Sequence, residues 1–233
     1  GMRLIQNADV IIYAGSLVNP ELTEFAKDSC EICNSAHMTL DEVIEVMEKA
    51  EAAGKNTVRL HTGDPSLYGA IREQTDRLDK LGIEYKICPG VSSFCGAAAA
   101  LKAEYTLPEI SQSVIITRMA GRTPVPEKES LESLAAHGAS MVIFLSAGMT
   151  SEVSERLQKG GYSAETPAAL VYKATWEDEK ICRCTVGTLA ETAESNGINK
   201  TALIVVGDFL GENRFLSKLY DPNFETGYRK AKK

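Results

Sequence analysis

A short segment that follows a predicted strand, Thr62-Gly63-Asp64-Pro65, carries groups that could bind a ligand. Glycine lets a ligand approach the backbone, the Asp64 carboxylate can bind hydroxyl groups or a cation, and Pro65 fixes the turn before a helix. The alternative is a plain strand-to-helix turn in which Asp64 caps the helix, and composition alone slightly favours it. Because parallel α/β sheets bind ligands beyond the carboxyl ends of their strands, the segment is a candidate ligand loop.

A second segment, Pro89-Gly90-Val91-Ser92-Ser93, also joins a predicted strand to a helix. Two adjacent hydroxyl groups at a helix start can bind a ligand, although capping is their commoner role. The helix behind them contains Gly96 and four alanines, which let another element pack closely.

Two arginines, Arg118 and Arg122, lie four residues apart on a third loop, which Pro124 and Pro126 stiffen. Guanidinium groups bind carboxylates through paired hydrogen bonds, so the pair suits a ligand that is rich in carboxylates. The alternative, that both are ordinary surface charges, stays equally open.

Several common catalytic motifs do not occur in the sequence: GxxxxGK[ST], GxGxxG, HExxH and GxSxG. The three histidines are scattered, and none has a triad partner at a familiar spacing. Hydrolase, kinase and nicotinamide-dehydrogenase functions therefore lose their usual support, and the catalytic residues stay unknown.

The composition describes an ordinary globular chain. It has 233 residues with a net charge of −7, 44% hydrophobic and 24% charged residues, which argues against disorder. An acidic chain whose only basic cluster is the tail Arg229–Lys233 is a poor binder of nucleic acid. No apolar run approaches the ~18 residues of a membrane helix, and no secretory signal is visible. We therefore expect neither a nucleic-acid nor a membrane partner.

The six cysteines do not have the spacing of a disulfide framework. Cys30 and Cys33 have the spacing of half a zinc site, but no second pair of ligands answers them. Plain structural thiols are favoured over metal or redox chemistry, so we expect no protein-bound metal and a reducing compartment, the cytoplasm. The other four, which we expect to be at least partly buried, are Cys88, Cys95, Cys182 and Cys184.

The first half of the chain alternates short strands with helices, which predicts a parallel, doubly wound sheet. Thr39 is a predicted helix N-cap, with Glu42 three residues later as its capping-box partner. Strands are predicted at 10–13, 57–60 and 85–88, and helices at 3–6, 21–29, 39–53, 70–81 and 95–101.

The pattern changes after Pro108, and we place a domain boundary near residue 112, giving an N-terminal α/β domain (1–112) and a C-terminal α/β domain (113–233). Residues 180–185 alternate like an antiparallel strand, so the second domain should hold a mixed sheet. Its other predicted strands are 114–117, 141–145, 168–172 and 201–207, and its helices are 129–137, 149–159 and 187–195.

Five segments of the sequence together resemble the tetrapyrrole methylase family. Residues 8–18, 61–69 and 89–93 resemble the family as a whole, and residues 117–126 and 168–176 resemble its branch that methylates C-11 of precorrin-4. The resemblance implies transfer of a methyl group from S-adenosylmethionine to precorrin-4 or cobalt-precorrin-4, on the route to cobalamin. It also implies two α/β domains with a ligand cleft between them, and a homodimer.

The same resemblance implies the site residues. Donor-binding residues in the first domain are Thr62, Gly63, Asp64, Leu67, Ser92 and Ser93. Those in the second domain are Leu145, Ala174, Thr201 and Ala202. Arg118 and Arg122 are the implied partners of the substrate carboxylates.

The family normally opens with a strand and a GxGPGDP loop, and the present sequence contains neither before its first helix. We therefore expect the first strand of the N-terminal domain to be absent, and methyl transfer by this chain to be weak. Two alternatives stay open: methylation at another ring carbon, which the loop 118–126 argues against, and a protein that binds without turnover. An RNA-methylating relative is disfavoured by the net charge of −7.

Overall fold

The structure, a computed structural model, describes residues 1–212 and 217–231. The chain divides into two compact units, Gly1–Ser93 and Phe94–Lys233. The boundary expected near residue 112 lies inside the second unit, because Ala97 and Leu101 of helix α4 (Ser93–Leu101) pack against that unit's sheet.

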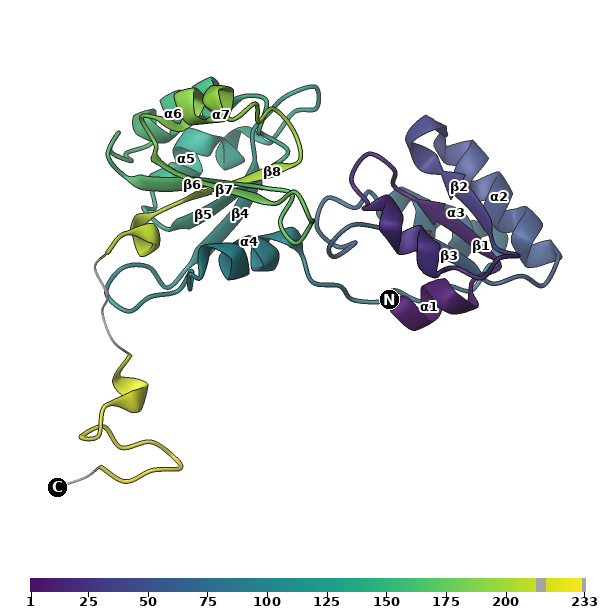
Figure 1. The fold of residues 1–233 in the computed structure, drawn as a ribbon, viewed down its shortest axis with the longest axis horizontal. Coiled ribbons are helices and arrows are strands. Elements are labelled where there is room, and N and C mark those ends of the chain that lie inside the picture. The colour runs from purple at the N-terminus through teal and green to yellow at the C-terminus, as the bar shows by residue number, and fades with distance from the viewer. Residues whose placement is uncertain (213–216, 232–233) are drawn as a thin grey trace. The chain divides into compact units, whose positions relative to one another are not determined.

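The first unit contains a three-stranded parallel sheet in the order β2-β1-β3. β1 (Val10–Tyr13) is the central strand, with β2 (Glu31–Asn34) and β3 (Thr57–Leu60) on either side of it (Figure 1). Its buried valine and isoleucines fit a strand that is covered on both faces. The parallel direction places the carboxyl ends of all three strands at one edge of the sheet.

Three α-helices cover this sheet. α2 (Leu40–Ala52) and α3 (Arg72–Leu81) pack on the face of Val10 and Ile12, and α1 (Met2–Asn7) packs on the face of Ile11. The capping box predicted for α2 is confirmed: the Glu42 N–H donates to Thr39 Oγ1 at 3.3 Å, and the Thr39 N–H donates to Glu42 Oε2 at 2.6 Å.

Two predictions for this unit are wrong. Residues 85–88 form no strand, since no backbone hydrogen bond joins them to any other described residue. β2 was not predicted, and the helix expected at 21–29 is the shorter 3₁₀ segment η1 (Pro20–Phe25). β2 is a four-residue edge strand, and Ile32 is 45% exposed. Because the strand is so little buried, its sequence does not show the apolar alternation that identifies a half-buried strand.

The second unit contains a five-stranded mixed sheet, as predicted, and its strand order is β4-β5-β8-β6-β7. β4 and β5 are parallel, and β8 is antiparallel to both of its neighbours. The strand bounds are β4 Val114–Arg118, β5 Ser140–Phe144, β6 Pro167–Tyr172, β7 Lys180–Thr185 and β8 Ala202–Val206.

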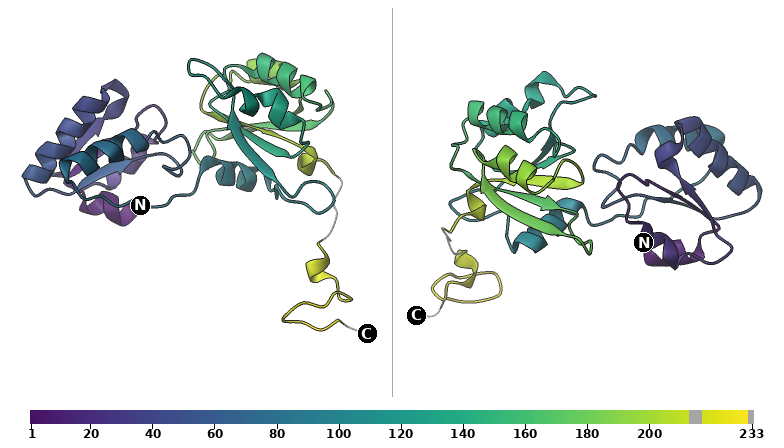
Figure 2. Two further views of the ribbon diagram at one scale, coloured as in Figure 1. Left: turned by 180° about the vertical axis from the view of Figure 1, so that it is seen from behind. Right: turned by 45° about the horizontal axis from the view of Figure 1, so that its top comes forward.

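Helices cover both faces of this sheet (Figures 1 and 2). α4 packs on one face, where its small residues contact Val142 and Val205. On the other face lie α5 (Leu131–Ala135), α6 (Thr150–Lys159) and α7 (Leu189–Ser195). The remaining 3₁₀ segments are η2 Ser35–His37, η3 Glu127–Glu129, η4 Asp208–Leu210 and η5 Lys218–Tyr220.

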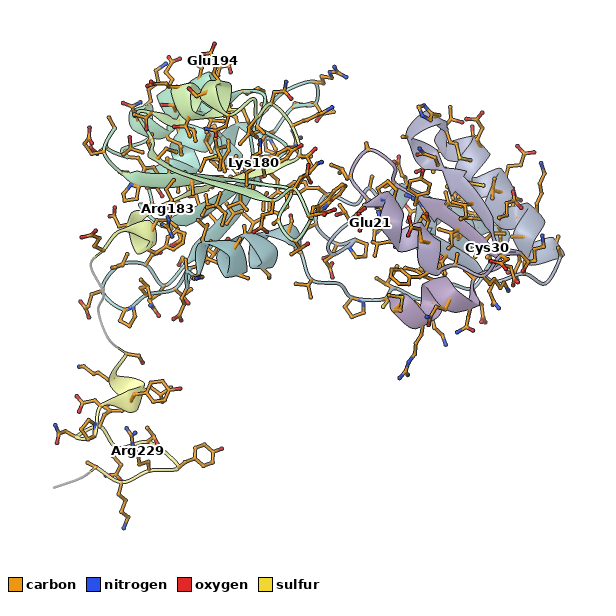
Figure 3. The ribbon with its side chains drawn as sticks, viewed as in Figure 1. Glu21, Cys30, Lys180, Arg183, Glu194 and Arg229 are labelled. Atoms are coloured by element: carbon orange, nitrogen blue, oxygen red, sulfur yellow. The ribbon has the colours of Figure 1, made fainter. Side chains whose placement is uncertain are left out.

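Arg183 connects the outer strand β7 to the α4 side of the sheet (Figure 3). Its guanidinium donates to the Leu101 carbonyl at 2.9 Å and to the Leu210 carbonyl at 3.4 Å. Within the described residues, no helix is both long and apolar enough to cross a membrane.

Candidate functional site

The first two candidate loops meet in the first unit. The Gly90 N–H donates to Asp64 Oδ2 at 2.8 Å, although 26 residues separate them in the sequence. Asp64 Oδ1 accepts the Ser66 N–H at 2.9 Å and also the Ser66 hydroxyl. The hydrogen bonds from Ser66 and Gly90 lower the pKa of Asp64, so it is a carboxylate at neutral pH.

These bonds bear on the capping role considered for Asp64, while its role toward a ligand stays a prediction. α3 begins at Arg72 with Ile71 as its N-cap, so Asp64 does not cap that helix. Its carboxylate instead fastens the segment after β3 to the segment before α4. The two segments therefore form one surface, which we name the paired loops (Thr62–Leu67 and Pro89–Ser93).

Glycine is required at two positions of the paired loops. A Cβ atom on Gly90 would lie 2.0 Å from the Gly63 carbonyl oxygen. Gly63 has φ +62°, and a Cβ atom there would lie 3.2 Å from Ser92 Cα. The two backbones thus approach more closely than side chains permit, and Thr62 and Gly63 are both exposed.

The two serines of the paired loops have hydroxyl groups without a protein partner. Ser92 is buried, Ser93 begins α4, and neither hydroxyl makes a hydrogen bond within the described residues. Leu67 is half-buried, and its N–H donates to the Asp64 carbonyl at 3.2 Å. The paired loops therefore bring together all six residues predicted for donor binding in this part of the chain.

The four residues predicted in the second unit gather at one end of three neighbouring strands. Leu145 follows β5, Ala174 lies two residues after β6, and Thr201 directly precedes Ala202, the first residue of the antiparallel β8. Tyr172 pairs with Ala202, and the Lys173 N–H donates to the Thr201 carbonyl at 2.9 Å. The strand register places these residues close to one another, as a shared ligand contact requires.

The backbone is strained at this end of the sheet. Leu145, Lys173, Thr175 and Thr201 have φ angles of 53°, 46°, 72° and 55°, in the left-handed region that favours glycine. Leu145 also exposes 57% of its surface although it is apolar. Non-glycine residues keep such strained backbone angles only where the surrounding structure holds them in place. Residues of this kind concentrate at ligand-binding sites.

The two arginines have different surroundings. Arg118 ends β4, and its guanidinium donates to the carbonyl oxygens of Met119 (3.2 Å), Thr123 (3.2 Å) and Pro124 (2.7 Å). Arg122 is exposed and makes no hydrogen bond or ion pair to the residues that the structure describes. The donors of Arg118 thus hold its own loop in shape, whereas those of Arg122 are available to a ligand.

His61 is a residue of this site that the sequence does not predict. It lies at the end of β3 directly before Thr62, and its buried Nε2 has no hydrogen-bond partner in the described structure. Burial, with the charge of Arg59 as a smaller cause, lowers the pKa of His61 to about 4. The Arg59 guanidinium is held by the Ile12 carbonyl at 2.9 Å and by Gln74 Oε1 at 3.0 Å.

All six cysteines carry free thiols. Cys88 and Cys95 are exposed, contrary to expectation, because the first lies in the unpaired segment 85–88 and the second on the outer side of α4. Cys30, labelled in Figure 3, and Cys33 are half-buried, and burial raises the pKa of both thiols. In the part of the chain that the structure describes, no three His, Cys, Asp or Glu side chains gather into a metal-binding group.

Comparison with known proteins gives consistent matches. The sequence model of the family described as Tetrapyrrole (Corrin/Porphyrin) Methylases matches residues 1–190. The cobalt-precorrin-4 C(11)-methyltransferase of Methanocaldococcus jannaschii is 57% identical over 100% of this chain and 90% of its own length.

Solved structures agree with the sequence matches. A cobalt-precorrin-4 methyltransferase superposes with a TM-score of 0.87 at 46% identity, over 90% of this chain and 87% of that one. A uroporphyrin-III C-methyltransferase of Thermus thermophilus, solved with S-adenosylhomocysteine, has a TM-score of 0.72 at 19% identity over 90% of each chain, which supports the fold alone.

Proposed function

Since this chain belongs to the tetrapyrrole methylase family, we propose that it transfers a methyl group from S-adenosylmethionine to C-11 of precorrin-4 or cobalt-precorrin-4 during cobalamin biosynthesis. The observation that carries the proposal is the 57% identity to a cobalt-precorrin-4 C(11)-methyltransferase over the whole chain. The segments 117–126 and 168–176, which resemble this branch of the family, support C-11 over another ring carbon.

The paired loops fit a methyl donor. Thr62 and Gly63 are exposed, and Ser92 and Ser93 offer hydroxyl groups that make no hydrogen bond to a described residue. In the second unit, Leu145, Ala174, Thr201 and Ala202 present backbone groups and an apolar side chain at one sheet end. We propose that each set contributes contacts to the donor.

Bound S-adenosylmethionine would supply an electrophilic methyl group on a positively charged sulfur. The chain's own contribution is then to orient the ligands and to exclude water, which together can account for most of the acceleration of a displacement reaction. No catalytic base is assigned. Arg122, with its unused donors, is the proposed partner of a substrate carboxylate.

The proposal includes two properties that the sequence suggested. We propose a homodimer, as the family resemblance implies. A reducing cytoplasm is the proposed location, which the six free thiols support. Sedimentation velocity of the purified chain tests the first property, and fractionation of the source cells tests the second.

The deciding experiment incubates the protein with S-adenosylmethionine and either precorrin-4 or cobalt-precorrin-4, and follows the products by mass spectrometry. Gain of one methyl group, located at C-11 by NMR, is the expected result, and the better substrate shows whether cobalt is present before methylation. A methyl group at another carbon would favour the first alternative. Binding of S-adenosylhomocysteine in calorimetry without any turnover would favour a binding-only protein.

A further inference from the structure

The turn between β6 and β7, residues 173–179, carries the proposed donor contact Ala174 between two strained residues. Lys173 has φ 46° and Thr175 has φ 72°. A β-branched residue such as threonine rarely adopts a positive φ, so the surrounding structure must hold this conformation.

Two carboxylates of the same turn act on the two strained residues. Glu179 Oε2 accepts the Thr175 N–H at 2.7 Å. Asp178 Oδ2 lies 2.6 Å from Lys173 Nζ, which raises the pKa of that lysine. The Lys173 ammonium also lies 4.9 Å from the centre of the Trp176 ring and 5.2 Å from that of Tyr172.

The third carboxylate of the turn provides a contrast. Glu177 is exposed and makes no hydrogen bond or ion pair to a described residue. The turn is therefore not merely acidic, because only Asp178 and Glu179 bind the residues on either side of Ala174.

Backbone bonds fix both ends of the turn. The Lys173 N–H donates a hydrogen bond to the carbonyl oxygen of Thr201, a residue proposed to contact the methyl donor. The Trp176 N–H donates to the Lys173 carbonyl oxygen at 2.9 Å. β7 begins directly after the turn at Lys180, which Figure 3 labels. The Thr175 N–H, by contrast, is bonded to a side chain, the carboxylate of Glu179.

We propose that Glu179 and Asp178 are positioning residues for the methyl donor: Glu179 holds the Thr175 backbone in the left-handed conformation and Asp178 holds the Lys173 side chain, so that the Ala174 backbone keeps its place at the end of β6. This inference rests on the proposed function, in which Ala174 contacts the donor. Neither carboxylate touches the donor itself.

The test uses S-adenosylhomocysteine in titration calorimetry with the full chain. Glu179→Ala removes the acceptor of the Thr175 N–H and should weaken binding about tenfold, because the turn conformation that binds the donor loses a charge-assisted hydrogen bond and is less populated. Glu179→Gln retains an acceptor oxygen and should restore most of the affinity. Glu177→Ala, the matched control on the same turn, should bind like the wild type.

A second pair of variants separates conformation from charge. Glycine adopts a positive φ without strain, so Thr175→Gly added to Glu179→Ala should recover the lost affinity. Asp178→Ala should weaken binding in the same direction as Glu179→Ala. In turnover assays Glu179→Ala should raise KM for S-adenosylmethionine and leave kcat within about twofold of the wild type, because the donor is held less well while the reaction itself is unchanged.

Equal affinity of Glu179→Ala and wild type would overturn the inference. So would failure of Thr175→Gly to rescue a variant whose thermal melting shows it to be folded. Should Glu179→Ala not fold, Asp178→Ala and Glu179→Gln provide the comparison. Wild-type protein that does not bind S-adenosylhomocysteine would instead contradict the proposed function, so the two failures are distinguishable.

Discussion

Arg118 and Arg122 share a loop but differ in what their guanidinium groups already bind. Arg118 donates to three carbonyl oxygens of its own loop, and Arg122 has no described partner. The forked donors of an arginine suit either task, so residue type alone does not separate the two roles.

We predict that Arg122→Ala weakens tetrapyrrole affinity about ten- to a hundredfold, the effect of losing a charged hydrogen bond. Affinity for S-adenosylhomocysteine should not change. Arg118→Ala should instead lower the melting temperature, because three carbonyl oxygens lose their donor. Fluorescence titration with the tetrapyrrole and thermal melting measure the two effects. If Arg122→Ala lowers the affinity for S-adenosylhomocysteine and leaves the affinity for the tetrapyrrole unchanged, the assignment of Arg122 to the substrate is wrong.

His61 links protonation to stability. Its pKa is about 4 in the folded chain, against the ordinary histidine value of 6.5 in the unfolded chain, so the unfolded chain binds more protons between these values. The contribution of neutral His61 to the free energy of unfolding should therefore be fully present above pH 6.5 and should decrease as the pH falls toward 4. After allowance for partial solvent screening, we expect a loss of about 1–3 kcal/mol across this window.

Urea unfolding at pH 7.5 and pH 5 measures the part of this loss that falls above pH 5. The variant His61→Gln should lack the His61 contribution, while His37→Gln, an exposed histidine of the same unit, should retain the wild-type difference. An unchanged pH dependence in His61→Gln would show that another group is responsible.

At the scale of elements, close backbone approach is the property that the paired loops depend on. A Cβ atom on Gly90 would meet the Gly63 carbonyl at 2.0 Å, which neither backbone can accommodate without moving. One on Gly96 would lie 3.5 Å from the Ala174 methyl, an ordinary contact.

We therefore predict opposite outcomes for two identical changes. Gly90→Ala should separate the paired loops and weaken S-adenosylhomocysteine binding at least about tenfold, since the Asp64–Gly90 hydrogen bond would be lost or distorted. Gly96→Ala should bind normally and should stabilise α4 slightly, because alanine favours a helix. Calorimetry and thermal melting compare them, and normal binding by Gly90→Ala would show that the loops tolerate separation.

Sequence reasoning found the elements whose side chains are strongly patterned. β1 and β5 are continuous apolar runs, and α2 carries a complete capping box, so each was predictable from local chemistry. The segment 85–88 has the alternation of a strand but no ladder partner in the described chain, and a ladder is not a local property. The reverse holds for β2, which pairs with β1 although its sequence has only a weak apolar alternation.

Part of the candidate site was predictable because it depends on residue type alone. The glycines and serines of the paired loops, which lie between a predicted strand and a helix, indicate a candidate ligand loop. The strain at Leu145 and Thr201 and the carboxylate contacts of the 173–179 turn follow from strand register, which requires the fold. The unpartnered nitrogen of His61 likewise depends on what buries it.

At the scale of the whole molecule, each unit has its own buried core. Val10, Ile12 and Ile44 belong to a core in the first unit, and Met141, Leu157 and Leu170 belong to one in the second. The segment 84–91 lies near the division of the chain at Ser93 and contributes no buried residue. It is exposed and makes no backbone hydrogen bond to a described residue up to Pro89, so it is the least protected part of this region.

Limited proteolysis should therefore cut the chain in this segment. Trypsin cleaves after lysine and arginine, and Lys86 is exposed in the middle of the segment, so we predict an early cut there. Cuts are also expected after Lys218 and Lys230, which are exposed in the C-terminal part. S-adenosylhomocysteine should slow the Lys86 cut several-fold, because a ligand on the paired loops would order the adjoining residues 89–93. The variant Lys86→Gln should lose this cleavage and retain the C-terminal ones.

Mass spectrometry of the fragments over time measures the cut at Lys86, its slowing by S-adenosylhomocysteine and its loss in the variant. Early cleavage inside α2 or β5, with Lys86 left intact, would show that the unpaired segment is protected by contacts that the fold does not reveal.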